Sequence, residues 1–170
     1  MAKYIYEDYN PKYKRQFSEQ KRILKKVLPD YAKIEHVGST AVPGLGGKGI
    51  IDIVIEVPYK KIKTTKNKLE KIGFEYRKSH IGDKKRKFFQ KIIKHTGKER
   101  RIHIHLTYPS SGYFDSFVRF RDYLRNNKKD MSEYAKVKKE AAKKAKEDGI
   151  KYANHKMKVL RKILKASKGI

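Results

Sequence analysis

The sequence contains no cysteine and no tryptophan, and its acidic residues are far outnumbered by basic ones. The absence of cysteine excludes disulfides, thiolate zinc sites and cysteine nucleophiles, and it is compatible with a reducing compartment. No apolar stretch approaches the roughly 18 residues that a membrane-spanning helix needs. Residues 1–8 lack the apolar core of a signal peptide. We therefore expect a soluble, cytoplasmic protein with no membrane partner.

The charge is strongly one-sided, with 45 Lys and Arg against 18 Asp and Glu, which gives a net charge of +27. Such a charge favours polyanions as partners, with RNA as the obvious one. The alternative is a Lys-rich proteome, which would spread solvated Lys over every helix without any function. Basic residues are dense at 60–71, 84–101 and 136–168, a distribution that decides for neither interpretation. Self-repulsion favours a monomer or a weak dimer.

The length and the apolar content predict one domain that spans residues 1–170 around a single core. Hydrophobic periodicity and turn residues predict helices at 11–28 and 60–72, helices from Ser116 onward, and strands at 32–36, 50–57, 74–78, 87–94 and 101–108. Turns are expected at 82–83 and 96–97. We expect an α+β fold of two layers, a mixed sheet flanked by helices, with 1–112 as its core and 113–170 as a helical C-terminal unit. The Lys-Ala run at 135–146 predicts an exposed helix.

One continuous segment, residues 34–57, joins a Gly-Ser turn, a glycine-rich loop and an acid-bearing strand. Gly38 allows backbone to approach a ligand closely, and Ser39 and Thr40 offer hydroxyl and N–H groups to an anion. The segment therefore predicts a phosphate site.

The strand at 50–57 is apolar and largely β-branched except for Asp52 and Glu56. A carboxylate in such a strand needs a charged partner or a cation, because its desolvation is costly. Side chains alternate along a strand, so Asp52, Val54 and Glu56 share one face. A hard cation such as Mg²⁺ accepts such oxygens.

Val37-Gly38-Ser39 followed by Asp52-Ile53-Val54-Ile55 resembles the signature of the nucleotidyltransferase superfamily. The chain as a whole resembles the GrpB-like family, through the motif at 35–45, His103-Ile104-His105, 120–125 and the Tyr-x-x-x-Lys of Tyr152 and Lys156. The resemblance implies a nucleotidyltransferase-like fold. It also implies a Mg²⁺- or Mn²⁺-dependent transfer of a nucleoside monophosphate from a nucleoside triphosphate to a hydroxyl acceptor, with Asp52 as metal ligand.

The chain departs from the superfamily pattern at two positions. Val54 stands where the second acid belongs, so a two-carboxylate metal clamp is incomplete. Glu56 could replace that acid only if the cation lay lower along the strand. Gly49 stands where the family usually has Pro, which makes the loop after Lys48 more flexible.

His103 and His105 share one face of a strand that, in the resembled fold, lies beside the Asp52 strand and often supplies a third acid. His105 could ligate the metal or contact a phosphate, and His103 could orient it or act as a general base. The structural alternative is a pair of strand histidines satisfied by neighbouring carbonyls. Zinc is disfavoured, because no third ligand is identified.

Four cations complete the expected nucleotide site. Lys48 follows the glycine loop and can neutralise a triphosphate, and Arg86 opens a strand beside the cleft. Arg121 and Arg125 lie one helical turn apart, spaced to hold phosphates or to pair with Asp122 or Glu133. Alternatively, Lys48 is one more solvated surface lysine, and Arg121 only stabilises its helix. Glu35 and His36 are expected to orient the loop.

Two function classes follow from these residues. The first is the metal-dependent nucleotidyltransferase, and the alternative is a non-catalytic nucleotide- or RNA-binding module that kept the phosphate loop. A hydrolase that uses the same cleft is a weaker third reading. Val54 discriminates between the first two, because Val54→Asp should enhance metal-dependent transfer if one ligand is missing. The residues specify neither the base nor the acceptor.

Overall fold

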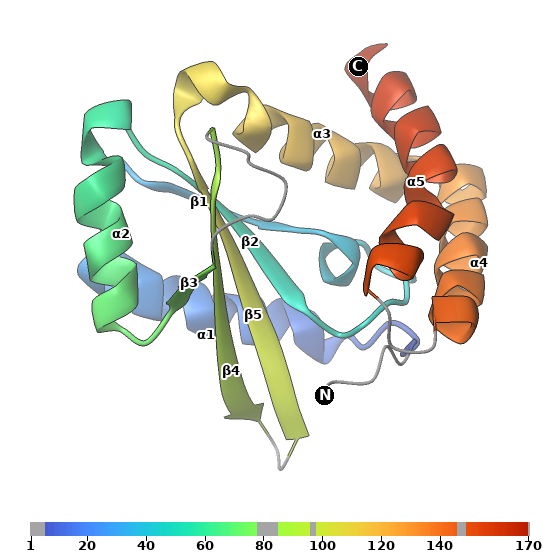
Figure 1. The fold of residues 1–170 in the computed structure, drawn as a ribbon, viewed down its shortest axis with the longest axis horizontal. Coiled ribbons are helices and arrows are strands. Elements are labelled where there is room, and N and C mark those ends of the chain that lie inside the picture. The colour runs from blue at the N-terminus through green and yellow to red at the C-terminus, as the bar shows by residue number, and fades with distance from the viewer. Residues whose placement is uncertain (1–5, 78–84, 96–97, 146–148, 170) are drawn as a thin grey trace.

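The structure is a computed structural model that describes residues 6–77, 85–95, 98–145 and 149–169 (Figure 1). Its sheet has five strands in the order β1-β2-β5-β4-β3, where β2 and β5 are parallel and the other pairs are antiparallel. The strands are β1 Lys33–Val37, β2 Ile51–Glu56, β3 Glu75–Arg77, β4 Lys87–His95 and β5 Lys98–Thr107. The helices are α1 Lys12–Val27, α2 Ile62–Lys71, α3 Tyr113–Asn126, α4 Lys128–Ala145 and α5 Gly149–Ala166. The expected α+β class, a mixed sheet flanked by helices, is confirmed.

One face of the sheet carries the main hydrophobic core. Alternate residues of the two central strands point to this face and are fully buried, among them Ile53 of β2 and Ile104 of β5. Leu24 of α1 and Leu69 of α2 pack against them, and α1 lies behind the strands in Figure 1. The β-branched run of the Asp52 strand is thus explained by burial of one face against two helices.

The opposite face of β1 and β2 is covered by α3, and α4 and α5 lie beside it at the right of Figure 1. Phe114 of α3 packs on Val37 and Val54, so α3 lies directly on β1 and β2. The loop between β1 and β2 is held against the helical unit, because Val42 and Leu45 share a buried cluster with Leu124, Tyr134, Val159 and Ile163. This arrangement places the glycine-rich segment between the sheet and α4–α5.

Several element boundaries differ from the sequence expectation. Helix α3 begins at Tyr113 rather than Ser116, after Gly112 takes a left-handed conformation with φ +70°. The expected turns at 82–83 and 96–97 lie outside the described residues, as does Lys78 at the end of the expected strand. None of the described helices combines the length and the apolar character needed to cross a lipid bilayer.

The expectation that 135–146 forms an exposed helix is wrong on one side of α4. Lys138 is only 4% exposed and Ala141 is fully buried. Tyr134, Lys138 and Ala141 lie three or four residues apart, so they form one helical stripe, and α4 turns that stripe inward against α5 and the loop before β2. Composition alone concealed the stripe, because most of the surrounding residues are Lys and Ala.

Candidate functional site

The turn after β1 is built around Gly38, whose φ of +71° favours glycine. A Cβ at this position would also collide with the carboxylate of Asp52. The short 3-10 turn of residues Ser39–Ala41, labelled η1, follows directly, and the amide of Ala41 donates to the Gly38 carbonyl at 3.2 Å. The Gly-Ser turn and Asp52 are therefore next to each other.

Strand register brings Asp52 beside two histidines. Asp52 is paired with His103 across the parallel β2–β5 ladder, and Val54 with His105. Oδ1 of Asp52 lies 3.2 Å from Nδ1 of His103 and 3.8 Å from Nε2 of His105. Burial alone would raise the pKa of Asp52, but hydrogen bonding and electrostatic attraction by His103 and His105 outweigh it and hold that pKa below its usual range. Asp52 is thus an ionised carboxylate.

His105 is oriented by Arg86. Nη1 of Arg86 lies 3.3 Å from Nδ1 of His105, and a guanidinium can only donate, so Nδ1 accepts and Nε2 carries the proton that faces Asp52. Phe117 of α3 stacks on the imidazole at 4.7 Å between ring centroids. Burial lowers the pKa of His105, although Asp52 acts in the opposite direction. The imidazole is therefore neutral, and its Nε2–H faces Asp52 at 3.8 Å, beyond direct hydrogen-bond distance.

His103 has the other tautomer. Its Nδ1 lies within hydrogen-bond distance of Asp52 and therefore donates to it, which leaves a lone pair on Nε2. Nε2 is buried and has no hydrogen-bond partner among the described residues. Phe88 of β4 contacts the ring edge-on at 4.8 Å between centroids. A carboxylate that fixes an imidazole through Nδ1 and leaves Nε2 to accept a proton is the arrangement of a general base.

Thr40 and His36 hold the turn in place through hydrogen bonds. The Thr40 hydroxyl donates to the Ile50 carbonyl at 2.9 Å and accepts from Nε2 of His36 at 3.0 Å. His36 stacks on Phe17 of α1 at 4.6 Å between centroids. Burial lowers the pKa of His36 to about 4, against the effect of Asp52 and with that of Arg125 and Arg121. The hydroxyl of Thr40 therefore connects η1 to Ile50, the residue just before β2. His36 binds this hydroxyl, which is the orienting position expected of it.

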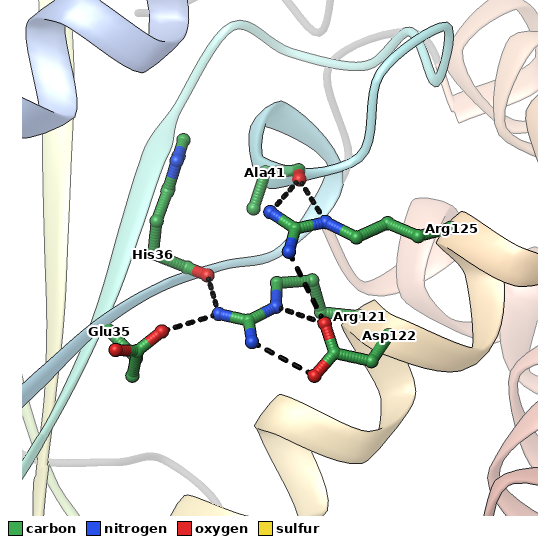
Figure 2. A network of polar contacts seen from close by, with 6 residues as sticks. All are labelled: Glu35, His36, Ala41, Arg121, Asp122 and Arg125. Carbon is green, nitrogen blue, oxygen red and sulfur yellow. Dashed lines mark hydrogen bonds and ion pairs between the residues drawn. The ribbon is translucent and has the colours of Figure 1, made fainter.

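Arg121 and Arg125 form a network that joins α3 to β1 and η1, as Figure 2 shows. Nη1 of Arg121 donates to Glu35 at 2.7 Å and to the His36 carbonyl at 2.9 Å, and its Nε and Nη2 atoms contact Asp122 at 2.7 and 2.9 Å. Arg125 donates to the Ala41 carbonyl at 2.7 and 3.0 Å. These contacts match the structural alternative, pairing with Asp122. A phosphate role for either arginine stays a prediction that these contacts do not support.

The loop before β2 is held by residues far away in sequence. Glu7 pairs with Gly47 in an antiparallel bridge with N···O distances of 2.6 and 2.8 Å. The ammonium of Lys138 donates to the Gly46 carbonyl at 2.7 Å and lies 5.3 Å from the ring centre of Tyr134. Lys138 was missed by the sequence reasoning, although Tyr134-Ala-Lys-Val-Lys138 repeats the Tyr-x-x-x-Lys spacing of Tyr152 and Lys156.

Lys48 and Lys156 complete a group of three amines near this loop. Their Nζ atoms lie 4.2 and 4.9 Å from the ring centre of Tyr152, a buried residue of α5. Burial lowers the pKa of Lys48 to about 8 and that of Lys138 to about 7. Burial also lowers the pKa of Lys156, whereas the charge of Asp52 favours the protonated form of all three. We name Lys48, Lys138 and Lys156 the lysine cluster.

The expected Mg²⁺ or Mn²⁺ site is not matched by the donors around Asp52. The described residues contain no group of three or more His, Asp or Glu side chains that could hold a metal ion. Val54, at the position of the second acid, is fully buried, and Glu56 is bound by Lys33 at 2.8 Å. A carboxylate flanked by two imidazoles offers too few oxygen ligands for a hard cation. The metal roles of Asp52, Glu56 and His105 therefore stay predictions.

The sequence motif and the geometry agree with a comparison against known families. The model described as "GrpB protein" matches residues 5–166. The chain belongs to the GrpB family. UPF0157 protein BH1888 of Halalkalibacterium halodurans is 33% identical over 160 residues, which cover 93% of this chain and 79% of that protein. The crystal structure of conserved protein GrpB from Enterococcus faecalis has 30% identity and a TM-score of 0.78, and the match covers 95% of this chain and 98% of the other.

Some GrpB relatives are much longer than the matched region. UPF0157 protein YqkA of Bacillus subtilis is 34% identical over 135 residues, which are 79% of this chain and only 38% of that protein. The names of these three relatives state no reaction. Membership of the family therefore fixes the fold, and the chemistry has to be argued from the residues.

Proposed function

We propose that this GrpB protein transfers a nucleoside monophosphate from a nucleoside triphosphate to a hydroxyl acceptor. The observation that carries the proposal is the contact of Asp52 with His103 directly beside the Gly38-Ser39 turn. A phosphate-approaching turn and an oriented imidazole are the two parts that such a transfer needs, because the reaction is dominated by positioning and charge stabilisation.

The nucleotide end of the site is supported by the glycine loop. Ser39 and the lysine cluster supply a hydroxyl and ammonium groups for the β- and γ-phosphates. The α-phosphate would then lie toward Asp52 and the histidines. His105, whose Nδ1 accepts from Arg86 and whose Nε2–H lies 3.8 Å from Asp52, has that one N–H to offer to a phosphate oxygen.

The acceptor end is assigned to His103, whose enclosed Nε2 must first be uncovered by a shift of the side chains around it. Nε2 takes the proton of the acceptor hydroxyl while that oxygen forms a bond to the α-phosphorus, and the bond from this phosphorus to the β-phosphate oxygen breaks. Pyrophosphate leaves with the electron pair of that bond. Asp52 stabilises the imidazolium that forms and keeps its ring in place. The donors around Asp52 do not form a two-carboxylate clamp, so no step is assigned to a protein-held metal.

The test is transfer of label. The purified protein is incubated with each α-labelled nucleoside triphosphate and total RNA, with and without Mg²⁺ or Mn²⁺, beside the variants Asp52→Ala and His103→Gln. We expect labelled acceptor, and a loss of at least about 100-fold in rate for both variants. The matched control is His155→Gln, which replaces an exposed histidine of α5.

Three other outcomes would overturn the proposal in different ways. Nucleotide or RNA that binds without any transfer indicates the non-catalytic binding module. Release of free labelled monophosphate without labelled acceptor indicates a hydrolase. Transfer that persists in Asp52→Ala places the chemistry elsewhere in the molecule.

A further inference from the structure

The two parallel strands of the sheet send the chain to opposite faces at their carboxyl ends. After β2 the chain passes through the 3-10 turn Tyr59–Lys61, labelled η2, into α2, which packs on the main core through Leu69. After β5 it passes through the 3-10 turn Pro109–Ser111, labelled η3, into α3, which packs on the other face through Phe114. In Figure 1, α2 lies to the left of these strand ends and α3 to their right. Open sheets bind ligands where adjacent parallel strands diverge in this way.

A cavity of about 310 Å³ lies at these strand ends. Its apolar lining includes Leu106 of β5, which is fully buried, and Ile62 of α2, which packs against the main core. The volume is at the lower end of the range of roughly 300–1,000 Å³ that is typical of ligand pockets. Leu106 points to the core face of the sheet, whereas His105, its neighbour along β5, points to the face of Asp52. The cavity is therefore distinct from the Asp52 site.

Two tyrosines border the cavity. Tyr59 begins η2, and Tyr108 directly precedes η3. Their rings meet edge to face, with 4.8 Å between centroids and an interplanar angle of 81°. The amide of Lys61 donates to the Pro58 carbonyl at 2.7 Å and fixes the turn that carries Tyr59. Tyr59 is nevertheless 71% exposed, so its ring has surface available to a flat aromatic partner such as a nucleobase.

The charged side chains among the described residues that line the cavity are all lysines, with no Asp or Glu between them. Lys60 of η2 and Lys63 of α2 are exposed, and Lys87 comes from β4. The ammonium of Lys87 lies 5.5 Å from the ring centre of Tyr76, which holds it near the sheet. Cations from separate elements beside an exposed aromatic ring are complementary to the alternating phosphates and bases of a nucleic acid strand.

From this arrangement we infer that Tyr59, Tyr108, Lys60, Lys63 and Lys87, which we name the tyrosine-lysine groove, bind single-stranded nucleic acid. A base stacks on Tyr59, and the phosphates beside it contact the lysines. A double helix is not accommodated in this way, because its bases are stacked on one another. The inference goes beyond the proposed transfer, since binding in the groove uses neither Asp52 nor His103.

The experiment is fluorescence anisotropy with the full chain and a labelled oligouridine of about ten nucleotides, without nucleoside triphosphate, at a salt concentration that screens the general positive charge. We expect saturable binding that Tyr59→Ala weakens by about fivefold or more, whereas Tyr59→Phe, which keeps the ring, stays within about twofold. Lys63→Met should weaken binding and lower the salt dependence by about one phosphate contact. The matched controls are Tyr31→Ala, at an exposed tyrosine that does not line the cavity, and Lys71→Met, at an exposed lysine of α2.

Two further probes separate stacking from charge. A phosphodiester chain of the same length without bases should bind more weakly than oligouridine and equally to the natural protein and Tyr59→Ala. Duplex DNA of the same length should also bind more weakly. Oligodeoxythymidine that binds as well as oligouridine assigns the groove to single strands of either sugar, and weaker binding assigns it to RNA; both results retain the groove.

The inference is overturned if Tyr59→Ala and Tyr31→Ala lose the same affinity, or if the chain without bases binds as well as oligouridine. Displacement of the strand by an equal concentration of uridine monophosphate would also overturn it, because the cavity would then be a mononucleotide site. Folding of each variant is checked by its thermal transition. Oligouridine binding without nucleotidyl transfer retains the groove and rejects the proposed reaction, so the two failures are distinguishable.

Discussion

The ammonium of Lys138 donates a hydrogen bond to the carbonyl of Gly46 at 2.7 Å, across 92 positions of sequence. The contact connects α4 to the loop that carries Gly47 and Lys48, so the C-terminal helices are part of the candidate site rather than an appendage.

Affinity for a nucleoside triphosphate should fall as the pH rises from 6 to 9. Burial gives Lys138 and Lys48 pKa values of about 7 and about 8, so above these values an amine must take up a proton when the anion binds. Each proton taken up weakens the apparent affinity by about tenfold per pH unit. The charged groups that act on Lys138 are Lys156, Lys48 and Asp52, and all three are unchanged in the variant Lys138→Met.

The measurement is a series of calorimetric titrations across this pH range. In Lys138→Met the step near pH 7 should disappear while a step near pH 8 remains. An affinity that does not change between pH 6 and 9 would contradict the assignment of these amines to the anion.

Gly38→Ala should abolish nucleotidyl transfer and lower stability. The substitution adds a Cβ at φ +71° and drives it into the carboxylate of Asp52. Gly112→Ala is the matched control, because Gly112 has φ +70° but no atom within 4 Å of an added Cβ. Both variants should lose about 1–2 kcal/mol in urea unfolding through backbone strain. Only Gly38→Ala should lose more than that and lose activity, and equal behaviour of the two would contradict the contact with Asp52.

Local patterns were sufficient to predict most of the fold. The β-branched run around Asp52 and the Gly-Ser turn have strong local preferences, and β2 and η1 lie where these preferences put them. The pairing of Asp52 with His103 is a matter of strand register between β2 and β5, and the sequence reached it only through a family resemblance. Side-chain alternation then places both residues on one face.

The residues that sequence reasoning misjudged depend on long-range packing. Lys138 looks like any other lysine of a basic helix, and only the packing of α4 on α5 and on the loop buries it. Arg121 has the spacing of a phosphate ligand, but Glu35, the His36 carbonyl and Asp122 take up its donors. Neither outcome can be predicted from the neighbouring residues in the sequence, because the partners of each side chain come from other elements.

Stability should fall in acid because of His36. Its folded-state pKa of about 4 lies below the ordinary value near 6.5, so the unfolded chain binds more protons than the folded one between these pH values. The contribution of neutral His36 to the free energy of unfolding is complete above pH 6.5. It decreases as the pH falls toward 4, by about 3 kcal/mol in total. Urea unfolding at pH 7.5 and pH 5 measures about 2 kcal/mol of this total, because the decrease is still incomplete at pH 5. His36→Gln, which can still donate to Thr40, should reduce the difference between the two pH values, and an unchanged difference would contradict the assignment.

Arg121→Met should destabilise the fold by about 2–4 kcal/mol, because it removes charge-assisted hydrogen bonds and leaves the buried His36 carbonyl without this donor. Arg119→Met, on the exposed side of the same helix, should change stability by less than about 0.5 kcal/mol. Affinity for a nucleoside triphosphate, measured under conditions where Arg121→Met is folded, should stay within about twofold of the natural protein. A large loss of affinity at unchanged stability would instead support the phosphate role predicted from sequence.

Val54→Asp should strengthen cation binding on the Asp52 face of β2. Val54 is fully buried on the face of β2 that carries Asp52, so the new carboxylate should lower the free energy of unfolding by about 3 kcal/mol in EDTA. Mn²⁺ would bind between the two carboxylates, because it accepts oxygen ligands, and should recover part of that loss. The measurement is the shift of Tm on addition of Mn²⁺, which should be larger in Val54→Asp than in the natural protein. Val54→Asn has the same shape without the charge and should show no such gain. Equal shifts in both variants would show that a cation does not bind on this face, even when a second acid is present.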